Sequence, residues 1–214
     1  MIKPYYEHAG ITIYHGDCRE VLPELDRADL CLVDPPYGLG ENAYRVAKRG
    51  KLAKTTDYGS FDWDKKPADN DSIQACIASG KVCIIWGGNY FHLPPSRGWL
   101  VWDKKNSGNF AECELAWTNA KTSVRIFRFM WNGMLRDGES RRKKRVHPAQ
   151  KPVELMQWCI SFAPDCETIV DPFAGSCTTA VAAKNLGVKC ICIEKSEAYC
   201  EAGARRLQQE VLPL

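Results

Sequence analysis

The stretch Leu30-Cys31-Leu32-Val33-Asp34-Pro35-Pro36-Tyr37 decides the fold, because it is typical of a buried strand that ends abruptly. The two prolines fix their own φ angles, donate no N–H and keep Asp34 out of helical geometry. The sequence therefore predicts a stiff, acceptor-only corner at a sheet edge, with a carboxylate and an aromatic ring. Such a corner suits an exocyclic amino group on a flat heterocycle. A Pro-Pro turn that merely ends a strand is the simpler interpretation.

Strands and helices alternate around this stretch, which indicates an α/β protein with a parallel sheet. We expect strands over residues 11–14, 30–33, 82–86, 98–102, 113–117, 124–129, 167–170 and 188–193. The expected helices span residues 19–25, 71–79, 152–162, 180–186 and 197–210. Because residues 98–129 hold three strands with short connections, we expect that part of the sheet to be antiparallel. Gly80 is expected to end the helix before it.

The length of 214 residues and the hydrophobic content of 45% favour one domain over residues 1–214. No apolar run approaches membrane-spanning length, and residues 1–10 are not signal-like, so a soluble, cytoplasmic protein without a membrane partner is expected. The eleven cysteines lie mostly in apolar runs, and no Cys-x-x-Cys pair occurs. Reduced core thiols explain them better than disulfides or a metal site, and no metal is expected.

Positive charge gathers in two stretches. Residues 41–56 hold five Lys/Arg and one acidic residue, and residues 121–151 hold ten Lys/Arg and two acidic residues. These two stretches together carry a charge of +12, so the rest of the chain carries −9 and the net charge is +3. Solvated loops would explain either run alone, but two basic loops beside an acidic body favour a polyanion partner. We expect DNA-facing loops over about 38–69 and 130–146. The candidate DNA-binding residues are Arg45, Lys48, Arg49, Arg141, Arg142, Lys143, Lys144 and Arg145.

A second candidate site follows the expected strand 167–170. The segment from Asp171 to Thr179 indicates a strand, a small-residue turn and a helix, which lets a ligand approach the backbone and the helix N-terminus. Glu194 ends the next strand 23 residues later, near the spacing of a ribose-binding acid. The turn matches neither a phosphate loop nor a Gly-x-Gly-x-x-Gly site. Asp171 would repel phosphate and favour a cation, so S-adenosylmethionine fits. A tight turn that packs a helix on the sheet is the alternative.

The two sites in this order resemble the β-class amino-methyltransferases of DNA, along most of the chain. The resemblance rests on Asp34-Pro35-Pro36-Tyr37, His147-Pro148-Ala149-Gln150-Lys151-Pro152, the turn at 171–179 and Glu194. It implies a doubly wound, Rossmann-like, seven-stranded sheet with an antiparallel hairpin and a circularly permuted motif order. The implied strand arrangement is 3-2-1-4-5-7-6, with the strands before Asp171 and Asp34 as neighbours 1 and 4. Cys177 departs from the family, which usually has glycine there.

The resemblance also implies residue roles. Asp34, Pro35, Pro36 and Tyr37 are the expected catalytic residues, and the His147–Pro152 segment is expected to help hold the methionine end of the cofactor. Asp17 belongs to an acidic turn expected near the cofactor adenine. The expected cofactor-binding residues are Asp17, Cys18, Asp34, His147, Gln150, Lys151, Asp171, Pro172, Phe173, Ala174, Gly175, Ser176, Thr178, Thr179, Glu194 and Lys195.

The implied activity is site-specific methylation of the N6 amine of adenine in DNA, with S-adenosylmethionine as methyl donor. Asp34 favours adenine, since the family leans towards Asp for adenine and Ser for cytosine. N4 methylation of cytosine is the nearest alternative, and RNA methylation, glutamine methylation of a protein and an inactive DNA-binding homologue are weaker ones. A restriction-modification role and a homodimer are left open.

Overall fold

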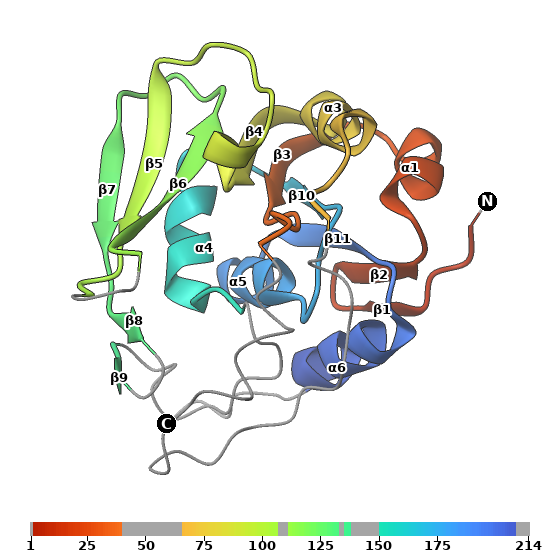
Figure 1. Ribbon diagram of the computed structural model, residues 1–214. Helices are drawn as coiled ribbons and strands as arrows, with labels where there is room; N and C mark the ends of the chain where they lie inside the picture. Colours follow the sequence, from red (N-terminus) through yellow and green to blue (C-terminus); the bar gives the residue numbers. More distant parts are fainter. Residues whose placement is uncertain (1, 40–65, 107–110, 133–134, 138–149, 209–214) are drawn as a thin grey trace.

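A mixed sheet of nine strands crosses the molecule in the order β1-β2-β11-β10-β3-β4-β6-β5-β7 (Figure 1). The computed structural model describes residues 2–39, 66–106, 111–132, 135–137 and 150–208. The strands are β1 (Tyr6–His8), β2 (Ile11–His15), β3 (Ala28–Val33), β4 (Gly80–Trp86), β5 (Gly98–Asp103), β6 (Cys113–Thr118), β7 (Arg125–Arg128), β10 (Thr168–Asp171) and β11 (Lys189–Glu194). Strands β8 (Trp131–Asn132) and β9 (Leu135–Arg136) form a separate antiparallel pair.

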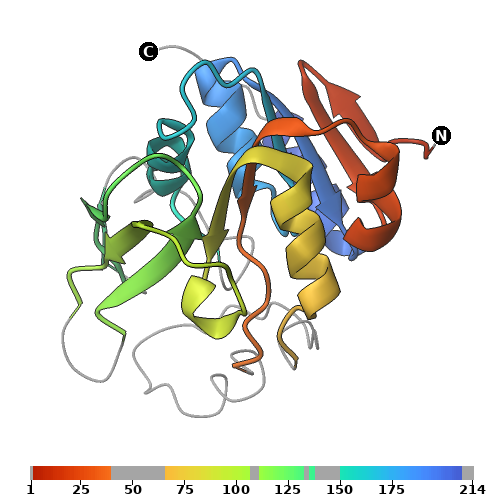
Figure 2. The same cartoon turned by 90° about the horizontal axis from the view of Figure 1, so that it is seen from above.

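Helices cover both faces of this sheet, as a doubly wound fold requires. Viewed from above, α3 and α1 lie on one face, and α4 and α5 on the other (Figure 2). The helices are α1 (Cys18–Val21), α3 (Asn70–Ser79), α4 (Val153–Ile160), α5 (Thr178–Leu186) and α6 (Glu197–Gln208), with 3-10 turns η1 (Leu22–Glu24) and η2 (Gly88–Tyr90). Helix α6 contacts β2 and β11.

Strand β3 shows how one apolar run serves two cores. Successive side chains of a strand point to opposite faces, so Leu30 and Leu32 belong to the cluster packed on α4 and α5, whereas Cys31 and Val33 belong to the cluster packed on α3. All four side chains are fully buried. A continuous apolar run is thus what a strand covered on both faces requires.

The seven inner strands have the order that the family resemblance implies, and the sheet has one additional strand at each edge. The inner strands β2-β11-β10-β3-β4-β6-β5 correspond to 3-2-1-4-5-7-6, and β10 pairs with β3 in parallel through Ile169↔Leu30. The expectation of seven strands was wrong, because β1 and β7 extend the sheet to nine. The antiparallel expectation holds for the β4–β6 and β5–β6 pairs, but β7 pairs with β5 in parallel.

Gly80 ends α3, as predicted, and it also begins the next strand. It is the first residue of β4 and has an extended backbone, with φ −127°. A Cβ at this position would lie 2.4 Å from the backbone nitrogen of Cys31. Glycine therefore lets β4 begin hard against β3, beside the strand that ends at Asp34.

The described residues hold neither a membrane-spanning helix nor a metal-binding cluster. None of their helices is long and apolar enough to cross a membrane. No group of three or more His, Cys, Asp or Glu side chains in the same ranges could hold a metal ion. The cysteines of these ranges are all free thiols, and most are buried.

Candidate active site

A single cavity of about 780 Å³ joins the two predicted sites. It opens where the parallel strands β3, β10 and β11 end, which is the usual ligand position in an open α/β sheet. Asp34 and Gly175 both line it, so loops about 140 residues apart in the sequence share one cleft. All expected catalytic and cofactor-binding residues line the cavity except His147, which lies outside the described residues.

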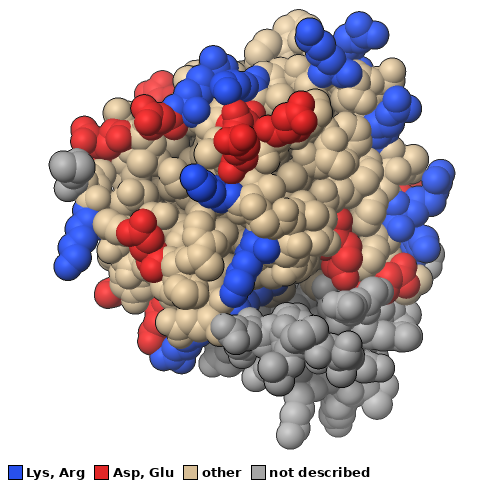
Figure 3. Space-filling model, turned by 180° about the vertical axis from the view of Figure 1, so that it is seen from behind, with Lys and Arg blue, Asp and Glu red and all other residues tan. Residues whose placement is uncertain are grey.

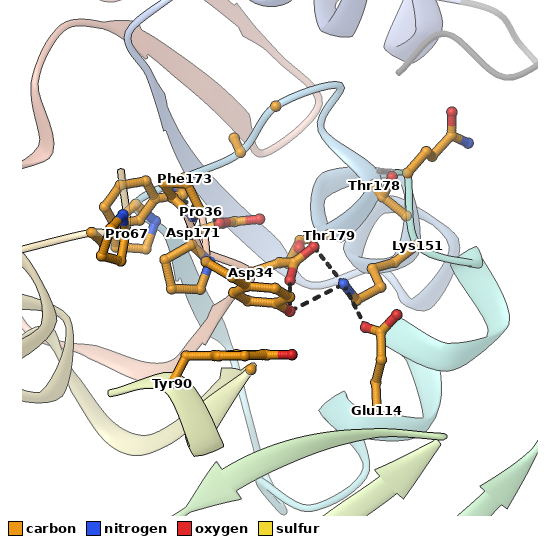
Figure 4. A pocket seen from close by; sticks show the side chains of 18 of the residues that line it. Asp34, Pro36, Pro67, Tyr90, Glu114, Lys151, Asp171, Phe173, Thr178 and Thr179 are labelled. Atoms are coloured by element: carbon orange, nitrogen blue, oxygen red, sulfur yellow. Dashed lines mark hydrogen bonds and ion pairs between the residues drawn. The ribbon is translucent and has the colours of Figure 1, made fainter. Parts of the chain in front are cut away.

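The groups at the Asp34 corner are acceptors, as predicted, but the sequence did not predict that they already receive donors from the protein. The Tyr37 hydroxyl donates a short hydrogen bond to Oδ1 of Asp34, and Nζ of Lys151 donates to Oδ2 at 2.6 Å (Figure 4). The carbonyl of Pro36 accepts the N–H of Ala68 at 2.9 Å. Burial raises the pKa of Asp34, while Lys151 opposes that rise. The carboxylate is thus largely buried and already held by two donors.

Lys151 lies between two carboxylates rather than at a cofactor-only position. Its side chain is 7% exposed, and Nζ is 2.6 Å from Asp34 and 3.0 Å from Oε2 of Glu114. Lys104 makes a second, shorter ion pair with Glu114. Burial disfavours charge on both partners, yet Lys151 and Lys104 lower the pKa of Glu114 to about 2, and the two carboxylates raise the pKa of Lys151.

Glu114 and Lys104 were not predicted from the sequence. Glu114 stands on β6 opposite Trp102 of β5, and Lys104 follows β5 with its ammonium 4.9 Å from the centre of the Trp102 ring. The only local indication was an acid inside an otherwise apolar strand. Its partner, Lys151, lies 37 residues further along the chain, so spacing alone could not pair them.

An aromatic pair stands beside the Asp34 carboxylate. The rings of Tyr37 and Tyr90 are stacked, with centroids 5.0 Å apart and planes at 20° (Figure 4). Phe91 meets Tyr37 edge-on. Gly87 makes this approach feasible: its φ is +67°, and a Cβ would lie 2.1 Å from the Tyr37 ring. The turn after β4 thus lines the same cavity as Asp34. Tyr90 was not predicted.

Asp171 is a buried carboxylate at the end of β10. It is 4% exposed, and its Oδ1 accepts the N–H of Phe173 at 3.2 Å. Burial raises the pKa of Asp171 to about 7, against hydrogen bonds from Thr179 and Phe173 that lower it. A group in this state gains from a cation in the cavity, because a nearby positive charge favours its ionised form.

The turn after Asp171 uses left-handed backbone at two positions, Gly175 with φ 51° and Cys177 with φ 57°. Cys177 is fully buried and stands just before α5. Its thiol packs against α6 at Gly203, where a Cβ would lie 2.5 Å from Sγ. The departure from glycine is therefore accommodated by a matching glycine on the neighbouring helix.

Glu194 connects this turn to the segment that follows β11. Its Oε2 accepts the N–H of Gly175 at 2.8 Å, and its Oε1 accepts the N–H of Ser196 at 2.7 Å. Burial raises the pKa of Glu194, and the two backbone donors lower it. A carboxylate oxygen has a second acceptor site, so Glu194 can still receive a hydroxyl from the cavity.

Asp17 is oriented by its own helix and by two cations. It caps α1 by accepting the N–H of Arg19 at 3.0 Å, and its Oδ2 bonds Arg19 at 2.7 Å and Lys195 at 3.2 Å. These bonds, Arg19 above all, hold the pKa of Asp17 below its usual range. The acidic turn expected near the cofactor adenine therefore lines the cavity as a bonded, fixed anion.

The predicted DNA-binding residues lie outside the described residues. On the face drawn in Figure 3, the described Lys, Arg, Asp and Glu side chains are interspersed over the surface. The prediction of two basic DNA-facing loops therefore stays a prediction. It concerns Arg45, Lys48, Arg49, Arg141, Arg142, Lys143, Lys144 and Arg145.

The mixed sheet with helices on both faces is an α/β fold that solved DNA methyltransferases share. The chain is similar to the PvuII DNA methyltransferase described as cytosine-N4-specific, with a TM-score of 0.62 at 17% identity over 99% of this chain and 91% of that one. It is also similar to the M1.HpyAVI–SAM complex, with a TM-score of 0.57 at 19% identity over 93% and 100%. These likenesses concern the fold.

Sequence comparisons point to one family. Residues 101–205 match the family model of the N6/N4 methylases, described as DNA methylase. The type II methyltransferase M2.LlaDCHI of Lactococcus lactis subsp. cremoris is 26% identical, over 98% of this chain and 93% of that protein. M2.DpnII of Streptococcus pneumoniae is 25% identical over 98% and 94%. Together these matches support a DNA methyltransferase of the N6/N4 family.

Proposed function

We propose that this chain uses S-adenosylmethionine to methylate the N6 amine of adenine in DNA. The observation that carries the proposal is the single cavity in which the Asp34 corner faces the turn at Asp171 and Glu194. The N6/N4 relatives support the reaction class, and a solved relative was described as a SAM complex. Asp34 at the first position of its motif supports adenine over cytosine.

The residues around the turn fit this cofactor. Asp171 is a buried carboxyl with a raised pKa, and the turn that follows it does not match a phosphate-binding loop. The site therefore suits a positively charged ligand. Glu194 retains acceptor sites for ribose hydroxyls, and the turn presents backbone at Gly175. Asp171, Gly175 and Glu194 would hold S-adenosylmethionine, which would supply an electrophilic sulfonium methyl group for the amine nitrogen, with the bonding electron pair left on sulfur.

The chain's own residues then act on the amine. That amine is a poor nucleophile because its lone pair is delocalised into the ring. The Asp34 carboxylate and the Pro35 carbonyl accept its two hydrogens, which moves the nitrogen towards tetrahedral geometry and stabilises its developing charge. The proton that the nitrogen loses goes to Asp34. Oδ1 of Asp34 can receive the amine while it holds Tyr37, because a carboxylate oxygen accepts more than one hydrogen bond.

Tyr37 supplies the stacking surface for the base. In a duplex the base must first leave the helix, at a cost of a few kcal/mol. Stacking on an aromatic ring returns about 1–3 kcal/mol. Loops 38–69 and 130–146 are proposed to hold the phosphate backbone while the base is extruded.

Mass spectrometry of nucleosides tests the proposal. The wild-type chain and Asp34→Ala are expressed in a host without adenine methylation, and genomic DNA is digested to nucleosides. We expect N6-methyladenine from the wild type and at least about 100-fold less from the variant, because the main acceptor for the amine is gone. Calorimetry should show that Asp34→Ala still binds S-adenosylmethionine. N4-methylcytosine would overturn the choice of base, and an unmodified genome would overturn DNA methylation.

A further inference from the structure

Two carboxylates share the ammonium of Lys151, and their surroundings differ. Asp34 holds Nζ of Lys151 at 2.6 Å and receives the Tyr37 hydroxyl. Glu114 holds the same nitrogen at 3.0 Å (Figure 4). Glu114 also pairs with Lys104. Within the described ranges, Glu114 therefore pairs with two cations, Lys104 and Lys151, whereas Asp34 pairs only with Lys151, which it shares with Glu114.

This difference in surroundings gives the carboxyls of Glu114 and Asp34 different pKa values. Lys151 and Lys104 lower the pKa of Glu114 to about 2 against the effect of burial, so it stays an anion. Burial raises the pKa of Asp34, Lys151 lowers it, and the negative charge of Glu114 raises it again. When the surroundings make the pKa values of two neighbouring groups differ in this way, the group with the higher pKa is the candidate to receive a proton.

We propose that Glu114, anchored by Lys104, is a positioning residue that draws part of the Lys151 charge away from Asp34 and so leaves Asp34 able to accept the hydrogen of the target amine. Glu114 acts through Lys151. The inference rests on the proposed methyl transfer, for which it names the device that adjusts Asp34.

The arrangement is built by three elements that the fold brings together. Glu114 comes from β6, Lys104 from the end of β5, and Lys151 from the segment before α4. The groups that face Asp34 are Tyr37 from its own turn, Lys151, Glu114, and Asp171 from β10. Of these, Glu114 can be changed without altering the corner itself.

Two substitutions should shift Asp34 in opposite directions. Glu114→Gln keeps the shape and an acceptor for Lys151 but removes the negative charge, so Lys151 neutralises Asp34 more fully and the pKa of Asp34 falls. Lys104→Met keeps the side-chain stem but removes the positive charge, so Glu114 draws Lys151 more strongly and the pKa of Asp34 rises. A merely structural role for Glu114 does not predict opposite signs.

The direct measurement is a pH titration of the Asp34 carboxyl carbon by NMR in the full chain without DNA, assigned by its absence from the spectrum of Asp34→Asn. It is made for the wild type, Glu114→Gln and Lys104→Met. The expected order of Asp34 pKa is Glu114→Gln below wild type below Lys104→Met. An unchanged or higher value in Glu114→Gln would overturn the inference, and if that variant does not fold, an unchanged or lower value in Lys104→Met would overturn it.

Kinetics provide the second readout. The acid limb of kcat/KM for DNA methylation reports the group that must be deprotonated in the free enzyme. It should move to lower pH in Glu114→Gln by the same shift as the NMR titration, with the KM for S-adenosylmethionine unchanged. A limb that stays in place would overturn the role of Glu114 in the reaction. A wild-type chain that methylates no DNA would instead refute the proposed function, while the NMR order would still decide the effect on Asp34.

Discussion

Replacing Asp171 by asparagine should stabilise the ligand-free protein at neutral and basic pH and change little in acid. Asp171 is 4% exposed, and burial raises its pKa from 3.8 to about 7. A shift of about three units corresponds to about 4 kcal/mol, at about 1.4 kcal/mol per unit. This is an upper bound for the gain, because the asparagine amide must also be desolvated.

The sign follows from proton binding. The folded state holds the Asp171 proton more tightly than the unfolded state, so ionisation penalises folding. The penalty is absent below about pH 4, grows between about pH 4 and 7, and is complete above about pH 7. The asparagine variant escapes it, so the difference in free energy of unfolding should rise with pH over that window and then level off.

Urea unfolding of the wild type and Asp171→Asn from about pH 4.5 to 8.5 measures this difference. Asp29→Asn is the control with the opposite sign, because Lys81 and Thr168 hold the pKa of Asp29 below its usual range and favour its ionised form. That variant should lose stability by a nearly constant amount over this pH range, because Asp29 is ionised in both the folded and the unfolded state above about pH 4.5. A difference for Asp171→Asn that is independent of pH, or a loss of stability at about pH 8, would refute the argument.

The affinity of Asp171→Asn for S-adenosylmethionine should fall, since the substitution removes the carboxylate that is proposed to face the positively charged cofactor.

Gly203→Ala should destabilise the protein by about 1–3 kcal/mol, because its Cβ would lie 2.5 Å from Sγ of Cys177. In a Cys177→Ala background the cost should fall sharply, and a double-mutant cycle with no coupling would contradict this packing. Replacing the basic residues 141–145 with glutamine should weaken DNA binding and reduce the slope of log K against log salt by roughly one for each phosphate that is no longer neutralised. A filter-binding series with an unchanged slope would make this run a solvated loop.

The central fold could be predicted because its information is local. Each inner parallel strand is an apolar run that ends at a turn residue or an acid, as β3 does before Asp34 and β10 at Asp171. The carboxyl ends of parallel strands meet at one edge, so the acids at these ends were expected in one place. Of the two edge strands, β7 was expected within residues 124–129, whereas β1, which is three polar and aromatic residues, was not expected.

The part of the site that the sequence did not predict comes from the antiparallel side of the sheet. Glu114 reaches Lys151 because β6 inserts between β4 and β5, and the strand register sets Glu114 opposite Trp102. No local pattern fixes that register. The sequence alone predicted Asp34 as the acceptor of the amine, but it did not predict that Lys151 pairs with both Asp34 and Glu114, which is the contact that our proposal uses to adjust the pKa of Asp34. That contact is a property of the sheet order, so a change on β6 can alter chemistry at the end of β3 without touching the substrate.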